Sequence, residues 1–337
     1  GHEPDANNRL LPPHLVMDPA DEEFVEMGTF FAQRGYVFVY NDVRGTARSD
    51  GDFFPLIDEA WGKNRDGYDT IEWAGRQPWS NGRVGMIGGS YSGMTQYLTT
   101  PTRPSHLRAL FVRYATPNVH TLLYRDGAFN LTRYLGIVLY HTLGNLLPLD
   151  SGKDPFAEER KRLAHAIERI DEWRNALPLT PLLPLEGTPY AELMYDEPLR
   201  HPDYDDYWRP LNMLEKCSQI DVPILHFAGW FDPNLAVMLE SFRTIRSDGA
   251  TEECRRGQRL VIGPWMHTEL AGRKAGEVDF GPDAEIDIEP ARLPWYDHWL
   301  KGLENDVHDS PPVRVFLMGD NRWLDLEDWP PPNVEYT

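Results

Sequence analysis

The sequence predicts an α/β fold, in which helices cover both faces of a mainly parallel β-sheet. Three observations carry this prediction. Apolar segments typical of buried strands alternate with helix-like segments, both before residue 118 and after residue 212. One such strand, 83–88, runs directly into a glycine-rich turn and then into a helix-prone segment. Between 118 and 212 the alternation stops, so we expect a helical cap domain inserted into the sheet domain.

The individual elements are predicted from hydrophobic spacing and segment length. Runs of aliphatic and aromatic residues bounded by glycine, proline or polar residues predict the strands, and amphipathic segments predict the helices. The expected strands are 36–41, 83–88, 107–112 and 222–230, with a further strand within 259–267, and the expected helices lie around 22–33, 68–74 and 94–98.

One helical face is visible inside the predicted cap. Its apolar residues recur at steps of seven, four and three, which is the spacing of one side of a helix. These residues are Phe156, Leu163, Ile167, Ile170, Trp173 and Leu177. The segment 177–198 is rich in proline and leucine, and we expect it to be more loop than regular element.

Composition excludes several classes of function. The 337 residues, 41% of them hydrophobic, can bury one large core or two. A net charge of −20 opposes binding to nucleic acid or to an anionic membrane. Cys217 and Cys254 are the only cysteines and have no C-x-x-C spacing, so neither a disulfide framework nor a zinc site is indicated. No apolar run is long enough to span a bilayer, and the lack of a visible signal peptide favours a cytoplasmic location.

Ser90 lies in the glycine-rich turn that follows the strand 83–88. The segment GGSYSG at 88–93 has the features of a nucleophile elbow, in which a sharp strand-to-helix turn exposes the serine hydroxyl. The usual pattern is G-x-S-x-G, and here the last glycine, Gly93, comes one residue late. The turn is not a dinucleotide fingerprint, because Ser90 stands where G-x-G-x-x-G needs its second glycine.

Two later strands lead to the other residue types that a serine nucleophile needs. The strand 222–230 is followed by Asp232, and the strand that starts at Arg259 leads to His267. The chain order Ser, Asp, His is that of α/β-hydrolases and differs from the orders in chymotrypsin and subtilisin. Because parallel strands end at one edge of a sheet, we expect the three side chains to converge there, with His267 in hydrogen-bond reach of both partners.

At these residues the chain resembles a family of serine acyl hydrolases. The family groups cocaine esterase, α-amino-acid ester hydrolases, glutaryl-cephalosporin acylases and X-Pro dipeptidyl peptidases. The resemblance is carried by GGSYSG at 88–93, AGWFD at 228–232 and GPWMH at 263–267. Similar stretches also occur at 41–45, 79–86, 201–208 and 316–319.

The resemblance implies a domain organisation. It implies an α/β-hydrolase domain formed by 1–117 and 213–305, a helical cap at 118–212, and a link at 306–337 to a C-terminal jelly-roll domain. It also implies that the sequence is truncated at both ends. We therefore expect an exposed apolar sheet edge near 36–41, and a second oxyanion donor, a tyrosine hydroxyl, from a loop that precedes residue 1.

The residue types assign a chemical role to each part of the site. Serine is a weak nucleophile until a base accepts its proton, and we assign this base to His267. Asp232 would orient the imidazole, and the backbone N–H of Tyr91 would donate to the oxyanion. The sequence thus predicts a serine hydrolase that cleaves a small-molecule ester or amide through an acyl-enzyme, without cofactor or metal. A homo-oligomer is left open.

The substrate is predicted only by class. Aromatic residues in the cap indicate an apolar or aromatic acyl pocket. An ester is favoured over a peptide, because the chain lacks the additional N-terminal domain that the resemblance implies for X-Pro dipeptidyl peptidases. Such a peptidase, or a non-catalytic binding protein that keeps the hydrolase fold, remains an alternative. Substrate contacts are expected from Tyr124, Phe129, Tyr134, Trp230 and Trp265.

Several residues have simpler structural interpretations. His226 lies inside an apolar strand and is expected to be a core histidine, and His298 is expected on a helix that packs on the sheet. Asp232, which precedes a proline, could cap the next helix. The segment 201–208 combines one histidine with three aspartates, but it lacks the central glycine of hard-metal loops. We therefore interpret it as a structured junction between cap and core.

Overall fold

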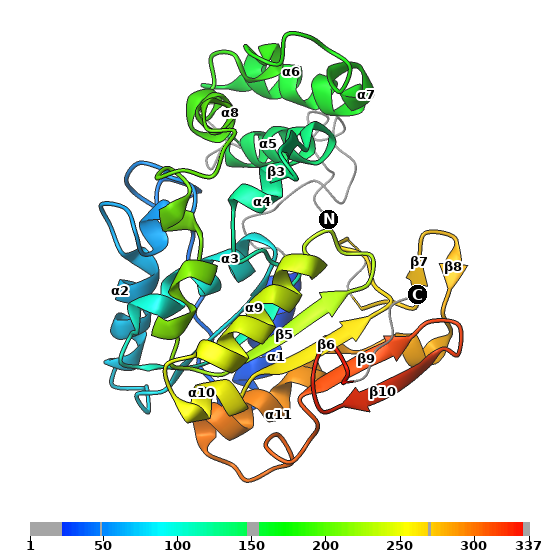
Figure 1. Cartoon of the computed structure of the whole chain (residues 1–337). Helices are drawn as coiled ribbons and strands as arrows, with labels where there is room; N and C mark the ends of the chain where they lie inside the picture. Colours follow the sequence, from blue (N-terminus) through cyan, green and yellow to red (C-terminus); the bar gives the residue numbers. More distant parts are fainter. Residues whose placement is uncertain (1–21, 48, 147–154, 269–270, 333–337) are drawn as a thin grey trace, which may run out of the picture. The chain divides into compact units, whose positions relative to one another are not determined.

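The computed structural model describes residues 22–47, 49–146, 155–268 and 271–332 (Figure 1). The chain divides into two compact units. The first unit combines Gly1–Pro55 with Leu122–Asp205, and the second combines Leu56–Thr121 with Asp206–Thr337.

The second unit contains a six-stranded sheet in the order β1-β2-β5-β6-β9-β10. Every neighbouring pair is parallel except β9 and β10, which form an antiparallel hairpin at one edge. The predicted α/β-hydrolase fold with its mainly parallel sheet is confirmed. The strands are β1 Val84–Gly89, β2 Leu107–Arg113, β5 Ile224–Gly229, β6 Arg259–Gly263, β9 Val313–Leu317 and β10 Arg322–Leu326.

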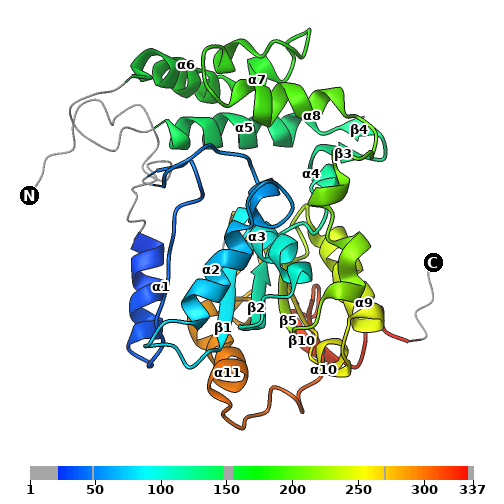
Figure 2. The ribbon, with the colours of Figure 1, turned by 90° about the vertical axis from the view of Figure 1, so that its left-hand side faces the viewer.

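Helices pack on both faces of this sheet. Figure 2 shows α9 (Leu235–Asp248) and α11 (Ile288–Lys301) on opposite sides of the strands. Side-chain alternation along the strands explains the two faces. His226 of β5 contacts the ring of Phe242 on α9, whereas Phe111 of β2 lies under the guanidinium of Arg292 on α11. The other helices of this unit are α2 Asp66–Gly75, α3 Tyr91–Thr99 and α10 Glu252–Arg256.

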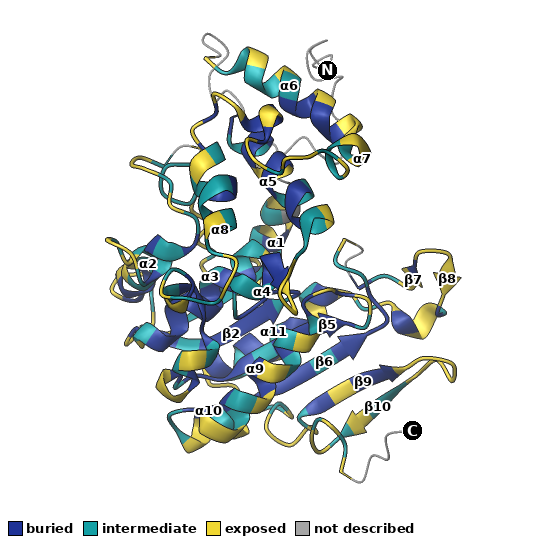
Figure 3. Ribbon diagram, turned by 45° about the horizontal axis from the view of Figure 1, so that its top comes forward, coloured by how far each residue is buried: buried dark blue, intermediate teal, exposed yellow. Residues whose placement is uncertain are grey.

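Burial is deepest on the central strands. Figure 3 shows β5 and β6 mostly buried, while β10 at the edge is exposed or intermediate. Strands that are covered on both faces need apolar residues at nearly every position, which is the pattern in β2 and β5. The strands predicted at 83–88, 107–112, 222–230 and within 259–267 are confirmed, as are the helices around 22–33, 68–74 and 94–98.

The predicted strand at 36–41 is wrong. No strand in the described ranges pairs with this segment. A β-prone sequence forms a strand only where a neighbouring strand satisfies its backbone groups. Val37 and Tyr40 are 57% and 52% exposed, but the segment is not the exposed sheet edge that was expected, because it is not a strand.

The end of the chain also differs from expectation. The prediction placed 306–337 in a link outside the catalytic domain, but β9 pairs with β6 and β10 pairs with β9 in the central sheet. Val313, Val315 and Phe316 of β9 are buried, which explains why this segment belongs to the core. The split near residues 121 and 206 lies close to the predicted cap boundaries at 118 and 212.

The first unit is largely helical. The predicted helical face is real only in part, because α6 ends at Glu168 and Leu177, beyond α7, is exposed. The segment 177–198 contains more regular structure than expected, including a π-helical turn at Glu192–Asp196. The elements are α1 Glu22–Ala32, β3 Tyr124–Arg125, β4 Ala128–Phe129, α5 Leu131–Asn145, α6 Ala157–Glu168, α7 Ile170–Trp173 and α8 Glu197–Arg200. A short helix, α4 His120–Leu123, contains the residues where the chain passes from the second unit to the first.

No helix in the described ranges is both long and apolar enough to cross a membrane.

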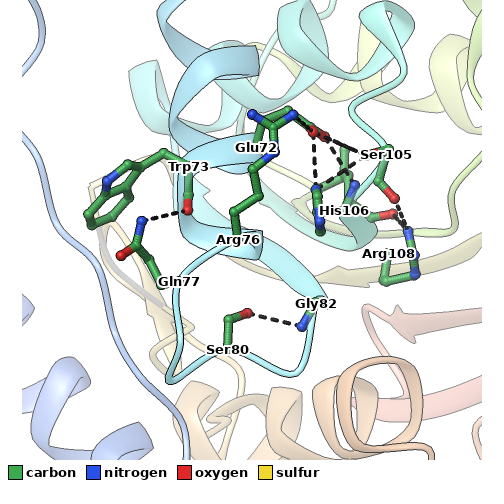
Figure 4. Close-up of polar contacts among 10 residues, drawn as sticks. Glu72, Trp73, Arg76, Gln77, Ser80, Gly82, Ser105, His106 and Arg108 are labelled. Carbon is green, nitrogen blue, oxygen red and sulfur yellow. Dashed lines mark hydrogen bonds and ion pairs between the residues drawn. The ribbon is translucent and has the colours of Figure 1, made fainter.

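A buried carboxylate connects α2 to the start of β2 (Figure 4). Glu72 accepts hydrogen bonds from the Ser105 hydroxyl and the His106 backbone N–H, and it pairs with the His106 ring and with Arg76. Burial alone would raise the pKa of Glu72, but the hydrogen bonds from His106 and Ser105 outweigh it and lower the pKa. This contact fixes the strand at its amino end, opposite the edge where the Ser90 turn lies.

The late glycine of the Ser90 turn has a packing reason. A Cβ atom on Gly93 would lie 2.5 Å from the Cβ of Ala115, so α3 could not approach β2 as it does. We expect Gly93→Ala to lower the free energy of unfolding by about 1–3 kcal/mol, although alanine has the higher helix propensity. Gly272→Ala is the control, because among the described residues, its chain neighbours aside, no heavy atom lies within 4 Å of its added Cβ. Denaturant titration of both variants measures the difference, and equal stability would contradict the packing argument.

Candidate active site

Ser90 occupies a strained turn between β1 and α3. Its backbone φ is 53° and ψ is −118°, a conformation that costs free energy for a residue with a side chain. The turn is held by a hydrogen bond of 2.9 Å from the Ser90 N–H to the Arg113 carbonyl, which extends the β1–β2 pairing. The side chain is exposed, and α3 begins at Tyr91. Strand, turn and helix therefore hold the hydroxyl outward, as the elbow pattern predicts.

Asp232 and His267 are brought together by the loops that follow β5 and β6. The two strands stay connected beyond their ends, because the N–H of Trp230 donates to Gly263 and that of Phe231 donates to Trp265. The Trp265 ring is stacked on Phe227 with the centroids 4.6 Å apart. These contacts fix the two loops side by side.

The three predicted side chains form one hydrogen-bonded chain. His267 Nδ1 lies 2.6 Å from Asp232 Oδ2, and His267 Nε2 lies 3.0 Å from Ser90 Oγ. The Asp232 side chain has no exposed surface, whereas that of His267 is 30% exposed. A carboxylate that accepts from Nδ1–H leaves Nε2 free of its proton, so that Nε2 can accept the proton of the serine hydroxyl.

The second oxygen of Asp232 also has a partner. Its Oδ1 accepts a hydrogen bond of 2.7 Å from the N–H of Asn234. Helix α9 begins at Leu235, with Asn234 in the N-cap position. Asp232 therefore orders the turn before the helix without being its cap, and the capping interpretation does not compete with the contact to His267.

The two rival histidines lie elsewhere. His226 is fully buried, and its Nε2–H donates to Gln258 Oε1 while Nδ1 accepts from the Tyr97 hydroxyl. Burial lowers its pKa to about 4. His298 is on α11, which packs on the sheet, and donates to the Leu303 carbonyl. Both structural interpretations are confirmed.

The residue after Ser90 is anchored through its side chain. The Tyr91 hydroxyl accepts a hydrogen bond of 3.1 Å from the N–H of Leu56, which itself has a left-handed φ of 64°. Burial raises the pKa of Tyr91, and the nearby Glu59 raises it further. The phenol thus remains neutral and fixes the first residue of α3, whose backbone N–H is the predicted oxyanion donor.

Glu59 is an unusual carboxyl group behind this tyrosine. Burial raises its pKa to about 7, and the neighbouring carboxyls of Asp66 and Asp58 add to the rise. Nothing in the sequence distinguishes Glu59 as a buried carboxyl group, because the acidic residues near it are typical of a solvated loop.

The predicted substrate residues divide between the two units. Tyr124, Phe129 and Tyr134 lie together in the first unit. The ring centroids of Tyr124 and Phe129 are 5.4 Å apart, and those of Phe129 and Tyr134 are 5.9 Å apart. Tyr134 is buried and its hydroxyl donates to the Met194 carbonyl. Tyr124 is also buried, so these two rings contribute mainly to the core of their own unit.

The two predicted tryptophans in the second unit differ from each other. Trp265 is completely buried, and its indole N–H donates to the Ala284 carbonyl. A side chain without exposed surface cannot line an open pocket, so the prediction of substrate contact is wrong for Trp265. Trp230 is partly exposed and donates to the Phe316 carbonyl.

The acidic segment 201–208 holds ion pairs. His201 Nδ1 lies 2.6 Å from Asp205 and Nε2 lies 3.3 Å from Glu197. The pKa of His201 is raised, mainly by its hydrogen bond with Asp205 and further by Glu197. Within the described residues, no group of three or more histidine, cysteine or acidic side chains could hold a metal ion.

Together these features define a class of protein. Ser90, His267 and Asp232 follow β1, β6 and β5, three parallel strands of one sheet, in the arrangement of an α/β-hydrolase. The sequence matches the profile of the X-Pro dipeptidyl-peptidase (S15) family over residues 3–269. The chain therefore belongs to this family of serine hydrolases.

Individual relatives are named esterases and peptidases. Cocaine esterase from Rhodococcus sp. (strain MB1 Bresler) is 30% identical over 314 residues, which are 91% of this chain and 52% of the relative. The crystal structure of an aminopeptidase from a marine sediment Thaumarchaeota archaeon superposes with a TM-score of 0.66 at 25% identity, covering 91% of this chain and 50% of that one.

An α-amino acid ester hydrolase shares the fold, with a TM-score of 0.62 at 23% identity over 90% of this chain and 49% of its own. The chain spans about half the length of these relatives.

The raised pKa of Glu59 predicts a pH-dependent stability. Above about pH 4.5 the unfolded chain loses this proton, while folded Glu59 keeps it up to about pH 7. The folded state then binds more protons, so its stability falls as pH rises through this window. Glu59→Gln removes the titrating carboxyl group. The free energy of unfolding of Glu59→Gln minus that of the unsubstituted chain should therefore increase by up to about 3 kcal/mol between pH 4.5 and 8. Urea titrations at both pH values measure this, and a constant difference would contradict it.

Proposed function

We propose that the chain carries the active site of a serine acyl hydrolase that cleaves an ester or amide through an acyl-enzyme. The supporting observation is the continuous hydrogen-bonded path from Ser90 Oγ through His267 to a buried Asp232, with distances of 3.0 and 2.6 Å. A non-catalytic binding protein would have no chemical need for this arrangement. Family membership and the named esterases among the relatives also support the proposal.

The proposed mechanism follows from the positions of the atoms. Ser90 Oγ attacks the substrate carbonyl carbon while His267 Nε2 accepts its proton. The Asp232 carboxylate stabilises the imidazolium, and the backbone N–H of Tyr91 donates to the oxyanion. When the tetrahedral intermediate collapses, the imidazolium protonates the leaving group and the acyl group remains on Ser90. Water then repeats the sequence, with His267 as base, and releases the acid.

The proposed substrate is a small-molecule ester. The relative at 30% identity is named cocaine esterase, which favours an ester over a peptide. A second candidate is cleavage after proline in an X-Pro peptide, and it is favoured by the family profile and by the structural neighbour named as an aminopeptidase. A panel of aryl esters, amino-acid esters and X-Pro amides separates the two by their kcat/KM values.

Substitutions in the hydrogen-bonded path test the mechanism. Ser90→Ala should lower kcat on any accepted substrate by about 10⁶-fold, because the nucleophile is lost. Asp232→Asn should cost about 10⁴-fold, because the amide supports the wrong imidazole tautomer. Steady-state kinetics on the best ester of the panel measure both effects.

His298→Gln is the matched control, since His298 lies on α11 and donates to a backbone carbonyl. It should keep kcat within about threefold, as expected for a surface substitution away from the site. Circular dichroism establishes that each variant is folded. Near-normal turnover by Ser90→Ala would require another nucleophile and would overturn the proposed function.

A further inference from the structure

We propose that Asn234 and Tyr114 are positioning residues that hold the Asp232–His267 pair in its working geometry. This inference rests on the proposed function and adds two residues to it. Neither has a role in the proton transfers of the proposed mechanism. Both instead connect the pair to the end of β2.

Asn234 joins the acid loop to the neighbouring strand. Its backbone N–H donates to Asp232 Oδ1 at 2.7 Å, and its side-chain N–H donates to the Tyr114 carbonyl at 2.8 Å. Asn234 is only 3% exposed, so water does not compete well for either hydrogen bond. The side chain therefore locks the backbone that in turn fixes the carboxylate.

Tyr114 connects β2 to the imidazole. It follows directly after β2, and its N–H donates to the Phe227 carbonyl of β5 at 3.0 Å. Its ring lies against His267, with the centroids 6.0 Å apart. The backbone φ of 49° is unfavourable for a bulky residue, and such conformations persist where surrounding contacts over-determine them. The side chain is 1% exposed, so the ring is a fixed wall beside the imidazole.

The two residues act on complementary degrees of freedom. Asn234 limits rotation of the Asp232 carboxylate, because one oxygen stays on the Asn234 N–H while the other faces Nδ1. Tyr114 limits sideways movement of the imidazole. A displacement of about 1 Å in such a site can lower the rate by about 10²-fold. Loss of either contact should therefore reduce kcat while leaving KM nearly unchanged.

Among the described residues, the following charged and titratable groups lie around the imidazole. Asp232 faces it from the loop after β5, Ser90 from the turn after β1 and Tyr114 from the end of β2. Arg113 lies beside Tyr114. A looser carboxylate would hold the Nδ1–H of His267 less firmly, so this hydrogen bond should lengthen once Asn234 is removed.

NMR tests the positioning role without any substrate. In the ¹⁵N-histidine-labelled chain, the His267 resonance is assigned by its absence from His267→Gln. We expect Asn234→Ala to move the proton resonance of His267 Nδ1–H upfield and to broaden it, because its hydrogen bond to Asp232 becomes longer. Gln258→Ala is the control, because Gln258 is a buried amide at the amino end of β6, away from the site edge. It should lower stability and leave this resonance unchanged.

Kinetics on the best ester supply the second test. Asn234→Ala and Tyr114→Leu should lower kcat by about 10–10²-fold with little change in KM, whereas Tyr114→Phe keeps the ring and should stay within about threefold. An unchanged Nδ1–H resonance with unchanged kcat in Asn234→Ala would overturn the inference, as would the same change of the resonance in Gln258→Ala. A changed resonance in a chain that hydrolyses no substrate would support the positioning role and reject the proposed function.

Discussion

The parallel alignment of β1, β2, β5 and β6 is the constraint on which the site depends. Neighbouring strand ends are in register, with Gly89 opposite Arg113 and Gly229 opposite Gly263. The loops after β1, β5 and β6 therefore start at the same edge of the sheet, although nearly 180 residues separate Ser90 from His267. A one-residue slip would turn every side chain of a strand to the other face and separate the three groups. Register thus determines whether the site exists at all.

Burial of the Asp232 carboxylate is the main electrostatic cost of this arrangement. A buried charge is strongly unfavourable unless it is hydrogen-bonded and paired. Asp232 meets that condition with one oxygen on the Asn234 N–H and the other on His267 Nδ1. The acid is therefore held by the fold, the imidazole is oriented by the acid, and the serine hydroxyl is placed by a strained turn. Each step of the proposed chemistry uses geometry that is fixed before substrate arrives.

The sequence predicted the parts of the fold that depend on local pattern. Apolar runs identified four strands, and the residue types at their ends identified Ser90, Asp232 and His267. The strand at 36–41 failed because pairing, which sequence pattern does not contain, decides whether a β-prone segment becomes a strand. Trp265 was misjudged because its burial depends on Phe227 and Ala284, which are distant in sequence. Tyr114 and Asn234 could have been found, since both lie just beyond strands that end at the site edge.

The central claim is that Ser90 is a nucleophile activated by His267. A fluorophosphonate probe tests it most directly, because the activated hydroxyl displaces fluoride and leaves a stable phosphonyl group on its oxygen. Intact-protein mass and peptide mapping should find one adduct, on the peptide that carries Ser90, and none in folded Ser90→Ala. An adduct on another residue, or no adduct on the folded chain, would contradict the account.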